Sequence, residues 1–183
     1  MDRAAAARAI DAFLIAIGRD PKAEPELEGS GARVADAFID ELCSGYGVDV
    51  GALLRGNIIA HGGGGIVELR DVAITTTCPH HLMTGMGKAT IGFAPKDKIV
   101  GVGALARLVD AFARRLTLQE SIGEGVVEAI EKNLAPRWAA CRIEMTHACM
   151  IARGERTHGA RLVTYAVRGD SAEALHFVRS EVP

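Results

Sequence analysis

The spacing of apolar residues changes at the glycine run 62–65, and this change constrains the fold more than any other feature. Before the run, apolar residues recur every three or four positions, as on one face of a helix. The later segments with the composition and spacing of strands are 66–77, 88–95, 98–102, 138–151 and 161–167. Helical spacing returns between the third and fourth of these, over 105–130. This order predicts an α+β fold, in which helices pack on one face of a mainly antiparallel sheet.

Residues 1–60 are predicted to form an N-terminal helical region, and residues 61–183 a second domain that contains the sheet. The apolar face of the first helix is formed by Ile10, Phe13, Leu14 and Ile17. A second helix is expected from about residue 33 to near residue 45, after a loop over 18–31 that is rich in Gly, Pro and charged residues.

Composition and charge exclude two classes of partner. A net charge of −2 gives no basic field for nucleic acid, and aromatic residues, at 4%, are too scarce for base stacking. No apolar run approaches the roughly 18 residues of a membrane span.

The N-terminal segment carries Asp2 and Asp11 within a helical pattern, so we do not interpret it as a signal peptide. With four irregularly spaced cysteines, the protein is expected to be cytoplasmic.

A thiol and two imidazoles fall within the sequence CPHH, residues 78–81. Cys78 and His81 have a spacing that lets a turn bring both to one metal ion, and Cys149 is the best candidate for a third soft ligand. Two thiolates and an imidazole favour zinc over magnesium or calcium, and three protein ligands leave one position open for catalysis. The alternative is that the cysteines are small buried side chains, and we adopt this interpretation for Cys141.

Two more histidines stand beside the predicted ligands. His80 precedes His81, and His147 stands two residues before Cys149. Because the pKa of histidine lies near neutrality, either can act as a general acid or base next to a zinc-bound water. The alternative is that one of them only orients a ligand.

Several motifs occur in a fixed order along most of the chain. They lie in the segments TCPHHLMTGMGKATIGFAPKDKIVG, ARLVDAFARRLTLQESI and THACMIARGERTHG. In this order and spacing they resemble the GTP cyclohydrolase I family, which has a CEHH motif followed by GKA, a helix ending in ARR-x-Q-x-QE, and a later THxCM-x-x-RG segment. The segment GARVADAFIDELCSGY is similar to the family's TPxRVAxxxxEIFSGY helix, so the resemblance covers about residues 30–167.

The resemblance implies a tunnelling fold, in which subunits join their sheets into a barrel. It also implies a large homo-oligomer, commonly a decamer, with active sites at subunit interfaces. Catalytic Zn²⁺ would be held by Cys78, His81 and Cys149. The implied reaction is hydrolytic opening of the imidazole ring of a purine, GTP, at C8, which yields formate and 7,8-dihydroneopterin triphosphate.

The resemblance assigns catalytic and substrate-binding residues as well. His80 and His147 match the family's proton-transfer histidines. Glu120 matches the carboxylate that binds the guanine N1–H and exocyclic amine, since a carboxylate offers two acceptors to two donors, and Gln119 is expected to bind substrate beside it. The residues that match phosphate-binding arginines are Arg33, Arg107 and Arg153.

Both lysines that the family places around the triphosphate are missing. Their positions hold Asp36 and Ala104, and Pro79 replaces the glutamate of CEHH. A triphosphate needs several cations, and each contact contributes on the order of 1–3 kcal/mol. Losing two weakens GTP binding by roughly 30-fold to 10⁴-fold unless other side chains replace them. The candidate replacements are Lys96, Lys98, Arg156 and Arg161.

Two enzymatic functions follow from these observations. The first is a cyclohydrolase that acts on GTP through a remodelled phosphate site. The second is a zinc hydrolase of the same family that acts on a less phosphorylated purine, such as a free base, nucleoside or monophosphate, or on a pterin-like heterocycle. A purely ligand-binding role is disfavoured, because such a protein has no need to keep both the zinc ligands and the acid–base pair.

Overall fold

The computed structural model of the protein describes residues 1–154, 156–169 and 171–179. It divides into two compact units, Met1–Ser44 and Gly45–Pro183. The predicted domains, residues 1–60 and 61–183, stay a prediction. Within the described residues, no helix combines the length and the apolar character that crossing a membrane requires.

The first unit consists of helices. Its elements are α1 (Arg3–Ala16), the 3-10 turn η1 (Pro25–Leu27), α2 (Ser30–Asp36) and the π-helical η2 (Ala37–Leu42), which continues α2. α1 begins at Asp2, whose carboxylate accepts a hydrogen bond from the backbone amide of Ala5 at 2.9 Å. α1 and α2 approach closely at Gly31, where a Cβ would lie 2.5 Å from the carbonyl oxygen of Ala7. The absence of a side chain at this glycine therefore permits the packing of the two helices.

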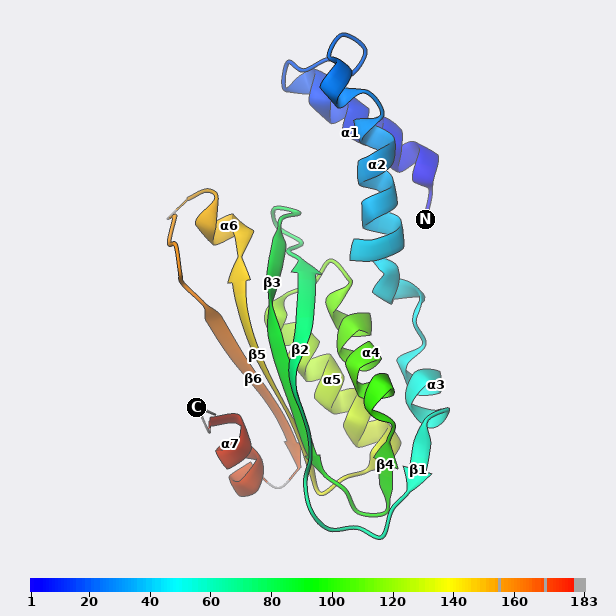
Figure 1. Cartoon of the computed structure of the whole chain (residues 1–183), viewed down its shortest axis with the longest axis vertical. Helices are drawn as coiled ribbons and strands as arrows, with labels where there is room; N and C mark the ends of the chain where they lie inside the picture. Colours follow the sequence, from blue (N-terminus) through cyan, green and yellow to red (C-terminus); the bar gives the residue numbers. More distant parts are fainter. Residues whose placement is uncertain (155, 170, 180–183) are drawn as a thin grey trace. The chain divides into compact units, whose positions relative to one another are not determined.

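The second unit contains a four-stranded antiparallel sheet in the order β2-β3-β5-β6 (Figure 1). Its strands are β2 (Val67–Thr77), β3 (Thr84–Ala94), β5 (Trp138–His147) and β6 (Leu162–Gly169). β3 and β5 pair without interruption from Gly85 opposite His147 to Ala94 opposite Trp138. A separate two-stranded sheet joins β1 (Ile58–Ala60) to β4 (Lys98–Val100).

Two helices cover one face of the four-stranded sheet (Figure 1). The helical elements before and between the strands are η3 (Ser44–Gly47), α3 (Val50–Arg55), α4 (Val102–Ala113) and α5 (Gln119–Leu134). α4 packs on β2, and α5 packs on β5 and β6. The buried residues of β5 that belong to this core alternate along the strand and are Ala139, Cys141, Ile143 and Met145. The predicted α+β fold, with helices on an antiparallel sheet, is confirmed.

The strand predicted over 138–151 is shorter than expected. It ends at His147, and the helical turn α6 (Ala148–Ile151) follows. β3 begins at Thr84 and β6 begins at Leu162, so the chain beyond His147 has no flanking strands with which to continue the ladder.

A C-terminal helix that the sequence did not predict, α7 (Ser171–Arg179), lies on the other face of the sheet. Its residues Ala174 and Phe177 pack with Trp138 and Ala140, which alternate with the core residues on the α4–α5 side. The indole Nε1 of Trp138 also donates a hydrogen bond to the carboxylate of Glu173 at 2.6 Å. One end of this face is therefore covered.

Replacing Leu108 by alanine is expected to lower the free energy of unfolding by about 2–5 kcal/mol, because this α4 side chain is 0% exposed in the core. The matched control is Leu175→Ala on α7, where the side chain is 37% exposed and the expected cost is below about 1 kcal/mol. Urea denaturation followed by circular dichroism measures both. Equal losses in the two variants would contradict the assignment of the core.

Candidate metal centre

The loop 78–83 between β2 and β3 is closed by two backbone hydrogen bonds. The amide of Cys78 donates to the carbonyl oxygen of Met83, and the amide of Leu82 donates to that of Cys78, both at 2.9 Å. Leu82 has a left-handed backbone conformation, with φ 54°. Neither hydrogen bond needs the amide hydrogen that proline lacks, so Pro79 fits this loop and restricts its backbone.

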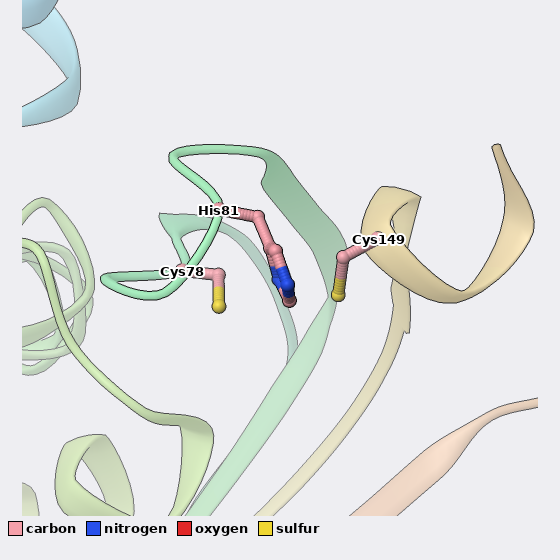
Figure 2. Close-up of side chains that lie close together, drawn as sticks. All are labelled: Cys78, His81 and Cys149. Carbon is pink, nitrogen blue, oxygen red and sulfur yellow. The ribbon is translucent and has the colours of Figure 1, made fainter. Parts of the chain in front are cut away.

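Cys149 meets this loop from α6, the helical turn after β5 (Figure 2). The candidate ligand atoms of Cys78, His81 and Cys149 all lie within 4.8 Å of one another. The two thiols are half-buried and the imidazole is exposed. The structure thus brings together the three residues that the sequence predicted as ligands, although Cys149 reaches the loop from a helical turn and not from a strand.

The chemistry and spacing of this cluster fit a zinc ion. Zinc binds thiolate sulfur at about 2.3 Å and imidazole nitrogen at about 2.0 Å in a tetrahedron, so its ligand atoms lie roughly 3.5–4 Å apart. The spread of 4.8 Å therefore needs a modest closure of the side chains. Two sulfurs and one imidazole select zinc over magnesium or calcium, and a three-residue set leaves one tetrahedral position open.

His80 and Arg153 both lie against the cluster. The Nδ1 atom of His80 is 3.7 Å from Sγ of Cys78. Nη1 of Arg153 is 3.0 Å from Nε2 of His81, and the imidazole nitrogen must be the acceptor because a guanidinium only donates. A predicted proton-transfer histidine and a predicted phosphate-binding arginine therefore stand next to the candidate ligands.

His147 ends β5 and is partly buried. Its Nε2 atom lies 2.9 Å from Oε1 of Gln119, the first residue of α5. Burial lowers the pKa of His147, and the carboxylate of Glu120 partly opposes this shift. The predicted residues Gln119, Glu120 and His147 thus come together where α5 begins and β5 ends.

Gly85 is a residue of this region that the sequence analysis missed. It lies opposite His147 in the sheet, and a Cβ there would be 2.8 Å from Nδ1 of the imidazole. Glycine is depleted in strands, so its presence near the start of β3 was a signal of a close approach.

The other two predicted phosphate-binding arginines are on α4 and α2. Arg107 is exposed on α4. Arg33 lies on α2 in the first unit, where its Nη2 donates to Oγ of Ser30 at 3.1 Å. The relation of Arg33 to the metal centre therefore stays a prediction.

The two positions without the family's lysines differ in their surroundings. Ala104 is 1% exposed and belongs to the hydrophobic core beneath α4. Asp36 forms an ion pair with Arg3, whose guanidinium also binds Asp40 at 2.7 Å. Arg3 therefore compensates part of the negative charge that Asp36 introduces.

Two of the candidate replacement cations lie far from the metal centre within this chain. Lys96 and Lys98 follow the far end of β3, an 11-residue strand, and so lie roughly 30 Å from the loop 78–83. Arg161 is bound to Glu144 at 2.6 Å. Lys96 and Lys98 therefore do not restore the missing lysines around the metal centre of the same subunit, whereas Arg161 precedes β6 near the end of β5.

Cys141 lies in the core, in agreement with its predicted structural role. Its side chain is 0% exposed, and burial raises the pKa of the thiol to about 12. It therefore stays protonated at neutral pH and is separate from the cluster of Cys78, His81 and Cys149.

Comparison with known proteins finds one family over most of the chain. The family model of GTP cyclohydrolase I matches residues 6–181. GTP cyclohydrolase 1 of Gloeobacter violaceus is 37% identical over 161 residues, which cover 88% of this chain and 74% of that protein. GTP cyclohydrolase 1 of Leptospira biflexa is 36% identical over 160 residues, which cover 87% of this chain and 86% of that protein.

A solved structure, the apo form of the archaeosine synthase QueF-Like, covers 58% of this chain at a TM-score of 0.49 and 14% identity. A structural similarity this low does not support a family assignment, so the family is assigned from the sequence comparisons alone. The family model spans nearly the whole chain, and the aligned regions cover most of the length of each relative. The chain therefore belongs to the GTP cyclohydrolase I family.

Proposed function

We propose that this protein is a zinc-dependent cyclohydrolase that opens the imidazole ring of GTP at C8, producing formate and 7,8-dihydroneopterin triphosphate. The observation that carries the proposal is the convergence of Cys78, His81 and Cys149 within 4.8 Å in a chain of this family. The reaction class is hydrolysis of a cyclic amidine C–N bond.

The side chains around the cluster have the chemistry that this hydrolysis requires. When bound in a three-ligand site, zinc lowers the pKa of water to about 7 and so supplies a nucleophile at neutral pH. Breaking the bond between C8 and a ring nitrogen also requires a proton on the departing nitrogen. His80, 3.7 Å from Cys78, and His147, at the end of β5, are the proposed donors and acceptors of protons.

Glu120 is the proposed anchor for the purine. It is exposed in the first turn of α5 and follows Gln119, whose amide oxygen lies 2.9 Å from Nε2 of His147, so it lies near the proposed acid–base group. Its two carboxylate oxygens can accept hydrogen bonds from the N1–H and the exocyclic amine of guanine. This pair of hydrogen bonds would fix the orientation of the ring.

The residues proposed to bind phosphate support a second class of substrate, a purine with fewer phosphates than GTP. Arg153 lies at the cluster, and Arg107 and Arg33 are the other proposed phosphate ligands. The buried Ala104 and the acidic Asp36 offer no cation where the family has lysines. These two positions favour a purine with fewer phosphates, such as a free base, nucleoside or monophosphate, as the alternative substrate.

We also propose a homo-oligomer, in the family's pattern a decamer, with sites at subunit interfaces. Within the described part of the chain, β2 and β6 have one neighbouring strand each, so both present an edge that another subunit can pair with. A cytoplasmic location, proposed from the four free cysteines, agrees with thiols that are needed as metal ligands.

Cys149→Ala is expected to abolish zinc binding, because two remaining ligands do not hold the ion. The matched control is Cys141→Ala, which removes a thiol from the core and should keep about one zinc per chain. Metal content after dialysis, measured by mass spectrometry, checks both. Full retention of zinc in Cys149→Ala would refute the ligand assignment.

A panel of guanine, guanosine, GMP and GTP, assayed for formate and for a fluorescent pterin after oxidation, tests the substrate. We expect zinc-dependent release of formate from GTP, with loss of release when zinc is removed. Turnover of guanine, guanosine or GMP without turnover of GTP would show that the substrate is the less phosphorylated purine. No ring opening of any member would reject both.

A further inference from the structure

We propose that Gln119 is a positioning residue that holds the imidazole of His147 in the tautomer with its hydrogen on Nε2, so that Nδ1 is the nitrogen that exchanges a proton. This inference rests on the proposed function, because it refines the role of His147 in proton transfer. It differs from the expectation that Gln119 contacts the substrate directly.

The orientation of the Gln119 amide is set by what surrounds its nitrogen. Nε2 lies 3.0 Å from the carbonyl oxygens of Ile143 and Leu162, and 3.1 Å from Oγ1 of Thr164. Carbonyl oxygens only accept hydrogen bonds, so a reversed amide would place an oxygen against two oxygens. Because Gln119 is 2% exposed, solvent does not relieve such a contact. The amide nitrogen therefore faces β5 and β6.

The amide oxygen then faces His147. Oε1 of Gln119 lies 2.9 Å from Nε2 of the imidazole. An amide oxygen only accepts, so Nε2 must carry a hydrogen, and in a neutral imidazole this leaves Nδ1 without one. Within the residues that the structure describes, Nδ1 of His147 has no hydrogen-bond partner. It is therefore the nitrogen that is available to accept a proton.

Gly85 determines where the ring lies. A Cβ at this position would be 2.8 Å from Nδ1 and 3.0 Å from Cε1 of His147, so any side chain would displace the imidazole. Gln119 thus sets the position of the hydrogen, and Gly85 leaves room for the ring. The donors and the acceptor of the Gln119 amide are all used inside the protein, which argues against a substrate contact.

The test uses the zinc-loaded protein labelled with ¹⁵N-histidine, without substrate. Long-range ¹H–¹⁵N correlation spectra identify the nitrogen that carries the hydrogen, and His147→Asn assigns the signals. We expect the hydrogen on Nε2 in the parent protein and a mixture of tautomers in Gln119→Met. With the purine that the panel identifies as substrate, Gln119→Met should lower kcat by about 10-fold to 100-fold and change KM by less than about threefold.

Two further variants separate positioning from simple loss of structure. Thr164→Val leaves both carbonyl acceptors in place and should keep the parent tautomer. Gln119→Glu puts a second oxygen against the carbonyl oxygens of Ile143 and Leu162, so it should lose the parent tautomer as Gln119→Met does. A hydrogen on Nδ1 in the parent, or an unchanged spectrum in Gln119→Met, would overturn the inference. Because the spectra need no substrate, absence of GTP turnover would contradict the proposed function and leave this result standing.

Discussion

The antiparallel register between β3 and β5 holds the parts of the candidate site together. The loop 78–83 leads into β3, while His147 and Cys149 leave the end of β5, and the register places Gly85 opposite His147. Because strand side chains alternate between faces, a slip of one residue would turn His147 away from Gln119. The buried residues of β5 beneath α4 and α5 oppose such a slip, so the core determines the geometry of the site.

The candidate metal ligands and the two positions that lack the family's lysines lie in different parts of the chain. The candidate metal ligands lie on the loop 78–83 and on α6, within the second unit. Ala104 lies on α4, and Asp36 lies in the first unit, where it pairs with Arg3. Substitutions at these two positions leave the candidate metal ligands unchanged, and we propose that this division lets a family member keep its chemistry and change its substrate.

The sequence predicted the features that depend on local pattern. β-branched segments identified β2 to β6 but not β1, which falls within the region predicted to be helical. Helical spacing identified α4 and α5, and residue types identified the candidate zinc ligands. It did not predict α6, because the end of β5 is set by where β3 and β6 begin. It also missed α7, which packs on the sheet through Trp138 and Phe177. The roles of Gly85 and Gln119 arise from contacts between distant residues, and a single sequence does not contain those distances.

X-ray absorption at the zinc edge of the zinc-loaded protein tests the account most directly, because it counts the ligand atoms. The account predicts two sulfur neighbours at about 2.3 Å and two nitrogen or oxygen neighbours at about 2.0 Å, from Cys78, Cys149, His81 and one non-protein ligand. A spectrum without sulfur, or with three or four sulfur neighbours, would contradict it.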